Sequence, residues 1–537
     1  MRKNKFILKL NVIFMAITLV FLSSCSFGGD KFFYTPILAI PETLDSREVT
    51  SIDGKNIIIN CYQGLMRVDE NNNIVPGCAL RYTHSPDFRR YTFYLNENCK
   101  WRLPKKKSKK LADILGEDYE KTFNTKVKAD DFLFAVQRAV SPENTNPDVF
   151  FTYNIKNAKE IHQGKADISS LGVSTSLDNV ITFELENPDE NFLYKLTLPV
   201  FMPTNREFFE KSKGRYGLLP TLILSNGPYY VSDISEDKYV KIKKSETFKD
   251  YKVKNDGVTF VLDEEQNLYD EKLAERKGYT IAKIPVNTET KNLPSIKSIE
   301  INNAVKTLIF NPSNANLKDI NFRKALFYAT DKKAFAENIN SFISKNTPIT
   351  INKDYKSVDY KFIYDKNLAK TNYARSSIRG EKINLTVSCL KEDEQRAKMI
   401  IANWQEVVGI NTSIKLETLD YNELFEKANS KTYDIIIFPI FAENKFADEI
   451  LMSLHSNFKE NFISIQSLEF DNLIYNASAQ SNSSAKNEAC NKAEKWIYDT
   501  GIFIPLENYK TLVEHRKSVK NIVVSRDGNF FFFPFAK

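Results

Sequence analysis

The stretch from Asp434 to Glu443 constrains the fold of this chain more than any other part of the sequence. It reads Asp-Ile-Ile-Ile-Phe-Pro-Ile-Phe-Ala-Glu, an apolar run of β-branched and aromatic residues closed by one acid. Such a run is typical of a strand buried on both faces, as in a parallel sheet. In open α/β sheets ligands bind beyond the carboxyl ends of the strands, which is where Glu443 stands. Its carboxylate either faces such a ligand or simply begins a solvated loop.

The residues before this run alternate between strand and helix patterns. Hydrophobic spacing predicts a strand at 383–387, a helix that ends at Gly409, a strand around 414–416 and a helix at 421–429. Strand, helix, strand, helix, strand implies two crossover connections and a parallel sheet. The C-terminal half is therefore predicted to be an α/β domain, which favours the functional interpretation of Glu443.

The first 25 residues are predicted to be an export signal rather than part of the fold. Four basic residues precede or open an apolar run at 12–22, and two serines separate this run from Cys25. The run is too short and wrongly flanked for a stable membrane span. Its end, Leu-Ser-Ser-Cys, resembles the bacterial lipobox, in which the cysteine is lipidated and becomes the mature N-terminus. The resemblance implies a lipid anchor on Cys25 and a body that faces the periplasm or the outer surface.

Size and charge narrow the classes of protein further. About 510 residues remain after the signal, enough for two or three domains. Hydrophobic residues make up 42% and charged residues 27% of the chain, which is ordinary for a globular protein. A net charge of +7 is small for this length and does not establish nucleic-acid binding. No further segment is long and apolar enough to span a bilayer.

Five more cysteines follow the signal, an odd number with no close spacing. They are Cys61, Cys78, Cys99, Cys389 and Cys490. An exported protein can form disulfides, and Cys78 and Cys99 are candidates for a pair across a β-meander. Buried free thiols are nevertheless the favoured state for all five.

The N-terminal half is rich in strand and turn patterns. Residues 31–94 are predicted to form short strands between turns. The lysine-rich stretch Lys105–Lys110 is interpreted as a solvated loop, with an anionic docking patch as the alternative. Asp130 is a candidate N-cap for a helix that continues to Val140.

No motif of a catalytic or cofactor-binding site occurs in the chain. The nucleophile, metalloprotease, phosphate-binding and paired-cysteine patterns by which such sites are recognised are missing. The histidines stand far apart without a carboxylate at ligand spacing, so they are interpreted as surface or internally satisfied residues rather than metal ligands. They are His84, His162, His455 and His515. No cofactor or metal is predicted, and an enzyme is disfavoured, although catalytic groups can also assemble only in space.

Short motifs follow one another along the whole chain. They are Thr43-Leu44-Asp45, Tyr62-Gln63-Gly64-Leu65, Val75-Pro76-Gly77, Tyr91-Thr92-Phe93-Tyr94-Leu95 with Trp101, Val127 to Phe132 with Arg138-Ala139, Asn226-Gly227-Pro228-Tyr229, Phe310-Asn311 with Asp319 to Leu326, and Ala493-Glu494-Lys495-Trp496 with Ile504-Pro505-Leu506. Their order and residues resemble the family 5 extracellular solute-binding proteins, the oligopeptide- and dipeptide-binding subunits of ABC importers. Each motif is degenerate by itself, but together they span residues 30–537 in the family's order.

The resemblance implies an α/β architecture, the two-lobed periplasmic-binding-protein type II fold with an extra domain inserted in the first lobe. Lobe I would comprise residues 26–65, 200–302 and 506–537, the extra domain 66–199, and lobe II 303–505. The lobes would close on the ligand by a hinge motion. The implied function is that of a monomeric substrate-binding lipoprotein that captures oligopeptides and delivers them to a membrane permease and its ATPase subunits, without catalysis and without nucleic acid.

The resemblance also implies which residues bind the peptide. In oligopeptide-binding members an aspartate pairs with the peptide's α-ammonium group. This aspartate follows the strand that corresponds to the apolar run after Asp434, and Glu443 falls on its position. A desolvated ion pair there discriminates against a ligand that lacks the cation. The peptide backbone pairs with two protein segments by strand addition. The corresponding residues are Phe438, Ile440 and Phe441 before Glu443, and Thr50, Ser51 and Ile52 in the N-terminal part.

Departures from the family at this site leave the size and class of the ligand open. Pro439 stands where oligopeptide binders usually carry glycine, and it offers no N–H. Ile440 replaces the usual tryptophan, and Glu443 is one methylene longer than the usual acid. These departures and the Lys105–Lys110 stretch motivate an alternative, a surface-exposed adhesion or cell-wall-fragment-binding lipoprotein of the same fold. An exported hydrolase is a third hypothesis.

Overall fold

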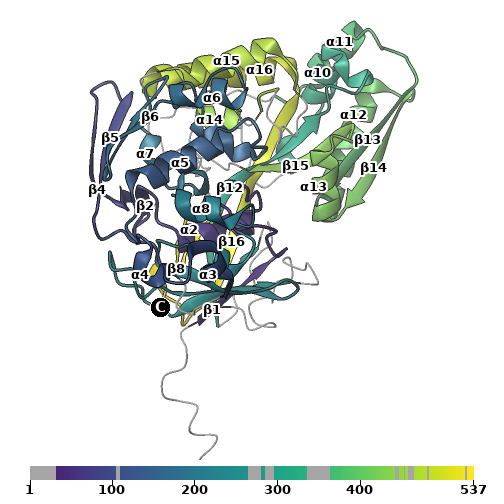
Figure 1. Ribbon diagram of the computed structural model, residues 1–537. Helices are drawn as coiled ribbons and strands as arrows, with labels where there is room; N and C mark the ends of the chain where they lie inside the picture. Colours follow the sequence, from purple (N-terminus) through teal and green to yellow (C-terminus); the bar gives the residue numbers. More distant parts are fainter. Residues whose placement is uncertain are drawn as a thin grey trace, which may run out of the picture.

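Three larger β-sheets organise the computed structural model of the protein (Figure 1). The residues that it describes are 32–103, 109–263, 280–284, 295–334, 363–441, 447–452, 454–456, 465–480, 483–525 and 529–537. Within these ranges, none of the helices combines the length and the apolar character needed to cross a bilayer. The predicted signal segment with Cys25 and the acid at Glu443 lie outside the described residues.

The largest sheet has six strands and contains the apolar run of the C-terminal half. In spatial order its strands are β11 (Ile281–Ile284), β16 (Phe503–Arg516), β12 (Ile296–Phe310), β15 (Ile435–Phe441), β13 (Ile383–Leu390) and β14 (Thr412–Leu419). Strand β13 is parallel to both β14 and β15, whereas β12 is antiparallel to β15 and β16. The predicted parallel arrangement is confirmed for β13, β14 and β15, and the sheet as a whole is mixed.

Two helices make the crossovers between these parallel strands. They are α12 (Glu394–Val408) and α13 (Tyr421–Asn429). Gly409 ends α12 with φ of 75°, in the left-handed region that glycine adopts without the steric cost of a Cβ atom. The strand–helix–strand pattern of the sequence therefore corresponds closely to the structure.

Strand β15 is buried on both faces, as its composition predicts. Ile435 and Ile437 belong to one apolar core, and Ile436 and Phe438 belong to another on the opposite side of the sheet. Successive side chains of a strand point to opposite faces, so an unbroken apolar run is needed where both faces are covered.

The two longest strands, β12 and β16, pass through different parts of the molecule. Ile301 of β12 and Val513 of β16 belong to the large core formed by the N-terminal half, whereas Val305 belongs to a core of the C-terminal half. Their pairing shifts register between these positions, at Asn302/Ala304, and again just after Val305, at Lys306/Thr307. Such bulges bend a strand locally. The paired strands thus connect two cores through an irregular segment.

Two four-stranded sheets lie in the N-terminal half. The first has the order β1 (Phe32–Ile37), β10 (Gly257–Leu262), β9 (Tyr239–Lys244) and β8 (Tyr229–Ser235). The second, which is antiparallel throughout, has the order β4 (Ala79–His84), β5 (Arg90–Leu95), β7 (Val180–Glu184) and β6 (Val173–Leu177). Residues of both sheets pack into one continuous buried apolar core.

Helix α2 (Ile52–Cys61) is absent from the sequence prediction, which treats residues 31–94 as strands and turns. Its β-branched Ile57–Ile59 segment reads locally as a strand. Tertiary contacts override this preference: the side-chain amides of Asn56 and Asn60 exchange hydrogen bonds of 2.7 to 3.1 Å with the backbone of residues 529–533. Ser51 caps the helix by accepting a hydrogen bond from the Gly54 N–H at 3.2 Å.

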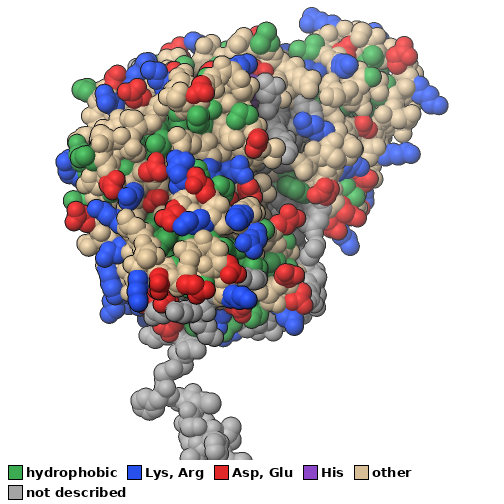
Figure 2. All heavy atoms as spheres, in the orientation of Figure 1, with side chains coloured by type: hydrophobic (Ala, Val, Ile, Leu, Met, Phe, Trp, Pro, Cys, Tyr) green, Lys and Arg blue, Asp and Glu red, His purple; other side chains and the backbone are tan. Residues whose placement is uncertain are grey.

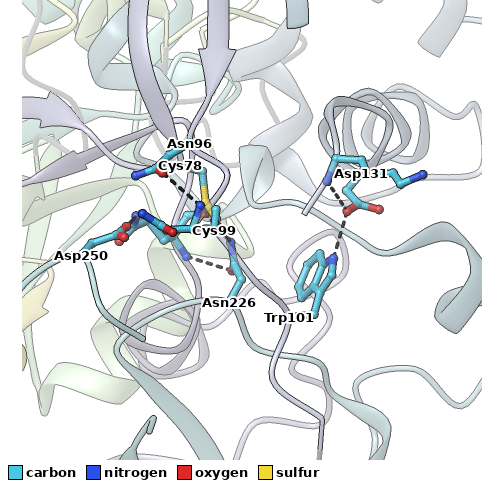
Figure 3. The surroundings of a disulfide bond; sticks show 10 residues. Cys78, Asn96, Cys99, Trp101, Asp131, Asn226 and Asp250 are labelled. Atoms are coloured by element: carbon cyan, nitrogen blue, oxygen red, sulfur yellow. Dashed lines mark hydrogen bonds between the residues drawn. A yellow bond between two sulfur atoms is a disulfide. The ribbon is translucent and has the colours of Figure 1, made fainter. Parts of the chain in front are cut away.

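Helix α5 (Ala129–Ala139) begins earlier than predicted. The acid that accepts a backbone hydrogen bond at the start of this helix is Asp131, not Asp130. Asp131 Oδ2 accepts hydrogen bonds at 2.9 Å from the backbone N–H of Lys128 and from Trp101 Nε1 (Figure 3). Burial raises the pKa of Asp131 to about 6, against the opposing effect of these two donors.

The lysine-rich stretch, predicted to be a loop, ends in a helix. Residues 104–108 lie outside the described part of the chain, but helix α3 (Lys109–Leu115) begins with the last two lysines. Over the face shown in Figure 2, basic and acidic side chains are interspersed rather than gathered into one field.

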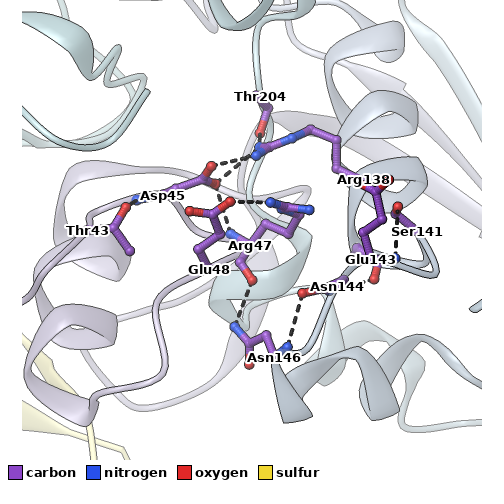
Figure 4. Close-up of polar contacts among 11 residues, drawn as sticks. Thr43, Asp45, Arg47, Glu48, Arg138, Ser141, Glu143, Asn144, Asn146 and Thr204 are labelled. Carbon is purple, nitrogen blue, oxygen red and sulfur yellow. Dashed lines mark hydrogen bonds and ion pairs between the residues drawn. The ribbon is translucent and has the colours of Figure 1, made fainter. Parts of the chain in front are cut away.

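A buried ion pair joins two of the sequence motifs. Arg138 of α5 donates to both carboxylate oxygens of Asp45, at 3.1 and 2.5 Å (Figure 4). The side chains are only 7% and 2% exposed, and the guanidinium group lies 3.8 Å from the centroid of the Phe209 ring. The motifs Leu44-Asp45 and Arg138-Ala139 therefore stabilise the fold by fixing the N-terminal segment against α5.

Cys78 and Cys99 form a disulfide, which corrects the expectation that all five cysteines are free thiols (Figure 3). The hairpin β4–β5 begins after Cys78 and ends before Cys99, and it brings their Cα atoms to 5.6 Å. The pairing across a β-meander was the alternative in the sequence interpretation. The other cysteines, Cys61, Cys389 and Cys490, are free and buried, as expected.

Candidate ligand-binding site

A cavity of about 760 Å³ lies between two parts of the chain that are far apart in sequence. Residues within 144–195 form one wall and residues within 448–486 form the other. The helical elements involved are η1 (Pro147–Thr152), α6 (Ala158–His162), α14 (Ala447–Met452), α15 (Leu468–Ser478) and α16 (Ser483–Thr500). Figure 1 shows α15 and α16 above α6 and α14 at the top of the molecule. The volume is typical of a ligand pocket, for which about 300–1,000 Å³ is usual.

Two ion pairs, one from each wall, lie side by side in this cavity. Lys195 binds Asp189 at 2.9 Å on the first wall, and Lys486 binds Asp448 at 2.9 Å on the second. Burial alone would raise the pKa of Asp189, but the ammonium groups of Lys195 and Lys486 outweigh it and lower that pKa. Burial would likewise lower the pKa of Lys486, but Asp448 and Asp189 hold it above its ordinary value. The two pairs therefore interact across the cavity and couple its walls.

A second polar group of the cavity is centred on Lys159 of α6. Its ammonium group hydrogen-bonds to the hydroxyl of Tyr475 on α15 and lies 4.4 Å from the centroid of that ring. His455 packs edge-on against the same ring at 5.1 Å. Burial lowers the pKa of His455, so this histidine is held in its neutral form around pH 7. Lys159 and Tyr475 are thus a direct contact between the two walls.

The remaining lining combines aromatic side chains with amides. Phe150, Phe151 and Tyr153 supply apolar surface, and Phe150 also packs against the core of the second wall. The amides are those of Asn144, Asn146, Asn154, Gln163, Asn187 and Asn476. Apolar walls with a few placed hydrogen-bonding groups suit a ligand that has both apolar and polar parts.

One wall of the cavity follows β15 in the sequence, after the strand end at which the sheet topology predicts a ligand. Asp448 of the cavity wall follows position 443 by five residues. The side chains of Phe438 and Ile440 do not line the cavity, because they are buried in the core of the C-terminal half. The side chain of Phe441 lies outside what is described, as does Glu443.

The backbone of β15 has one edge turned away from β12. Asn311 donates its N–H to the Asp434 carbonyl at 2.9 Å, and the pairing with β12 then continues without a shift. Alternate residues of an antiparallel strand direct their backbone groups to opposite sides, so those of Ile437, Pro439 and Phe441 face away from β12. The proline therefore removes no hydrogen bond from the β12–β15 ladder, which explains why it is tolerated.

This second edge of β15 is only partly occupied. Strand β13 pairs with it at Ile435 and Ile436 and then diverges. No other strand within the described ranges pairs with residues 437–441 along this edge.

The N-terminal residues of the predicted site lie before and at the start of α2. Thr50 and Ser51 precede the helix, Ser51 is its N-cap, and Ile52 is its first residue. The amide of Asn146, which lines the cavity, donates to the carbonyl groups of Arg47 and Val49 at 2.8 and 2.9 Å. The segment before α2 is thus fixed directly to the first wall, although residues 50–52 themselves do not line the cavity.

Most cavity residues are absent from the sequence prediction. Lys159, Asp189, Asp448 and Lys486 lie in helices or loops of ordinary polar composition, where charged residues usually indicate a solvated surface. No local signal distinguishes them, because their burial depends on a wall that comes from a distant part of the chain.

The two apolar bodies, their connection through β12 and β16, and the cavity between distant segments define a two-lobed solute-binding protein. The family model for bacterial extracellular solute-binding proteins, family 5, matches residues 73–462, and the chain belongs to this family. Members of the family bind their substrates and are not enzymes, so the resemblance found in the sequence and the prediction of a non-enzyme are confirmed.

Named relatives agree with this assignment over nearly the whole chain. The chain is 23% identical over 570 residues to the oligopeptide-binding protein OppA of Bacillus subtilis (strain 168), with 99% of each chain covered. It is 24% identical over 493 residues to the periplasmic murein peptide-binding protein MppA of Escherichia coli (strain K12), covering 87% of this chain and 86% of that protein.

A solved structure shares the fold. The crystal structure of Haemophilus influenzae OppA in complex with RPPGFSPFR superposes with a TM-score of 0.75 at 18% sequence identity, covering 95% of this chain and 99% of that one. The two-lobed type II architecture expected from the sequence is thereby confirmed.

Proposed function

We propose that this protein is the substrate-binding lipoprotein of a peptide ABC importer, which captures oligopeptides between its two lobes and delivers them to a membrane permease. The observation that carries the proposal is the cavity between residues 144–195 and 448–486. The names of the relatives, oligopeptide-binding and murein peptide-binding proteins, support a peptide as the ligand.

The lobes are proposed to divide as the family resemblance implies. Lobe I comprises residues 26–65, 200–302 and 506–537, with the extra domain at 66–199, and lobe II comprises 303–505. In support, the core to which β12 belongs changes between Ile301 and Val305. The register shift at Asn302/Ala304 in this interval is suited to a hinge, because a bulged strand pair bends more easily than a regular one.

Peptide recognition is proposed to combine strand addition with one ion pair. The edge of β15 that faces away from β12, to which Ile437, Pro439 and Phe441 turn their backbone groups, and the segment Thr50-Ser51 with Ile52 are the two partners of the peptide backbone. Because Phe438 and Ile440 turn their backbone groups to β12, the proposal keeps Phe441 of the three β15 residues named from the sequence. Glu443 binds the peptide's α-ammonium group. Because Pro439 turns its nitrogen to this edge, the ligand lacks one backbone hydrogen bond there and must bind more through its side chains.

Anchoring and delivery complete the proposal. Cys25 carries the lipid that holds the monomer at the membrane surface, where the permease and its ATPase subunits accept the peptide. The lobes open and close around the ligand, and the contact between Lys159 and Tyr475 is one of those that a closed form would make.

The test is to identify what the protein binds. Protein purified from its native host is unfolded, and the released small molecules are identified by mass spectrometry. Peptides are expected, and the same synthetic peptides should bind the refolded protein in calorimetry with one site per chain. Release of no peptide, together with no binding from a mixed peptide pool, would refute the proposal.

A further inference from the structure

A row of aromatic rings lines the first wall of the cavity. The ring centroid of Phe150 lies 6.1 Å from that of Phe151 and 5.7 Å from that of Tyr153, and Tyr153 lies 5.9 Å from His162. All four side chains line the cavity and are half-buried. Phe150 and Tyr153 are three residues apart at the end of η1, a 3-10 helix, in which side chains at this spacing lie above one another. The local backbone thus turns these two rings to the same side.

The second wall presents a ring to this row. Tyr475 of α15 lines the same cavity and is 41% exposed, although Lys159 and His455 already contact its ring. Burial raises the pKa of Tyr153, and the nearby Tyr475 adds to this rise, so the two tyrosines approach one another from opposite walls. Their rings make no ring contact with each other within the described part of the chain. Part of the cavity therefore lies between aromatic surfaces of both walls.

The charged side chains of the lining are engaged or exposed. Four of them form the two buried ion pairs described above, each at 2.9 Å. The ammonium group of Lys159 hydrogen-bonds to Tyr475, and the carboxylates of Glu160 and Glu186 are exposed to solvent, which screens them. A charged ligand side chain that enters the cavity would have to disrupt a buried pair, which is costly, whereas a neutral side chain leaves both pairs intact.

We propose that this cavity selects peptides with an aromatic side chain, which packs between Phe150 and Tyr153 of one wall and Tyr475 of the other. Half-buried rings that line a cavity lose further contact with water when a ligand ring covers them, and ring pairs at about 4.5–7 Å add stabilisation beyond the buried area. The inference rests on the proposed peptide-binding function and adds the substrate class, peptides with phenylalanine, tyrosine or tryptophan at the position that enters the cavity.

The probe is a pool of alanine pentapeptides in which each position in turn carries phenylalanine, tyrosine, leucine, lysine or glutamate. Protein freed of co-purifying molecules by dialysis from urea is incubated with the pool, and the retained peptides are quantified by mass spectrometry. At one position the wild-type protein should retain the phenylalanine peptide about 10- to 100-fold more strongly than all-alanine peptide, the range expected for burial of one such side chain. The phenylalanine peptide should also exceed its leucine counterpart by about 2- to 10-fold, as an aromatic pair contributes, and the lysine and glutamate peptides should not exceed alanine.

Substitutions on both walls test the role of the rings. Tyr153→Ala and Tyr475→Ala each remove one ring, Tyr153→Phe keeps the ring, and Tyr239→Ala removes a half-buried tyrosine of β9 outside the cavity as a matched control. Each alanine variant in the cavity should lower the preference for phenylalanine over alanine by about 2- to 10-fold and still retain alanine peptide. The phenylalanine variant and the control should match the wild type. If an alanine variant retains no peptide, the leucine variant at the same position, which keeps apolar volume without a ring, is judged by the same criterion.

Each failure has its own meaning. Equal retention of phenylalanine and leucine peptides at every position by the wild type, or an unchanged preference in either cavity variant, overturns the inference and leaves peptide binding intact. Retention of no peptide at all by the wild type, from this pool or from a mixed peptide pool, overturns the proposed function and the inference with it.

Discussion

Replacing Asp45 by asparagine is expected to lower the free energy of unfolding by about 3–5 kcal/mol, the usual cost of breaking a buried ion pair by removing one partner. The structure shows why the loss should be large. Arg138 would keep its positive charge in a site where the paired side chains are 7% and 2% exposed. Its remaining neighbours there are the Thr204 hydroxyl at 3.5 Å and the face of the Phe209 ring, neither of which replaces a carboxylate.

A double-mutant cycle separates this charge effect from lost packing. Urea unfolding is followed by circular dichroism for Asp45→Asn, Arg138→Met and the double variant. Because the double variant buries no unpaired charge, it should be more stable than the sum of the single losses predicts, by about 1–3 kcal/mol. Strictly additive losses, or a loss below about 1 kcal/mol in Asp45→Asn, would refute the view that this pair fixes the N-terminal segment.

Other predictions concern the ligand, a titrating group and the disulfide. Glu443→Gln should weaken binding of a co-purified peptide by about 2–5 kcal/mol in calorimetry, and an unchanged affinity would remove this residue from the site. Since burial raises the pKa of Asp131 to about 6, the folded chain binds this proton more tightly than the unfolded chain, and wild-type stability falls as pH rises from about 4 to 6. Asp131→Asn keeps an acceptor for Trp101 and should be up to about 3 kcal/mol more stable relative to the wild type at pH 7.5 than at pH 4, measured by urea unfolding; a difference independent of pH would contradict this. Replacing both Cys78 and Cys99 by alanine should cost about 3 kcal/mol, because the bond closes a loop with a separation of 21 residues, and an unchanged urea midpoint would count against a disulfide in the mature protein.

Sequence reasoning succeeded where the structural information is local. The order of strands and helices from β13 to β15 follows from hydrophobic spacing, and Gly409 marks the end of α12 as a residue that tolerates positive φ. It failed for α2, because Asn56 and Asn60 hold that helix through partners more than 470 residues away. It also favoured free thiols over the Cys78–Cys99 bond, since pairing of distant cysteines depends on a hairpin register that spacing alone does not specify.

The candidate site, like the fold, was predicted from the sequence only in part. The carboxyl end of β15 was predicted as a ligand position, and one wall of the cavity, which includes Asp448, follows that end in the sequence. The cavity's own charged residues were not predicted, because each lies in a segment whose polar composition is that of an ordinary solvated helix or turn.

The amino-acid sequence by itself determined the parallel strands of the C-terminal half and membership of the solute-binding family, since periodicity and motif order are properties of neighbouring residues. Only the tertiary structure decided that Lys159 meets Tyr475 and that Asp189 and Lys486 interact across one cavity. The physical reason is that a charged side chain becomes part of a binding site when another segment removes it from water, and the identity of that segment is set by packing over hundreds of residues.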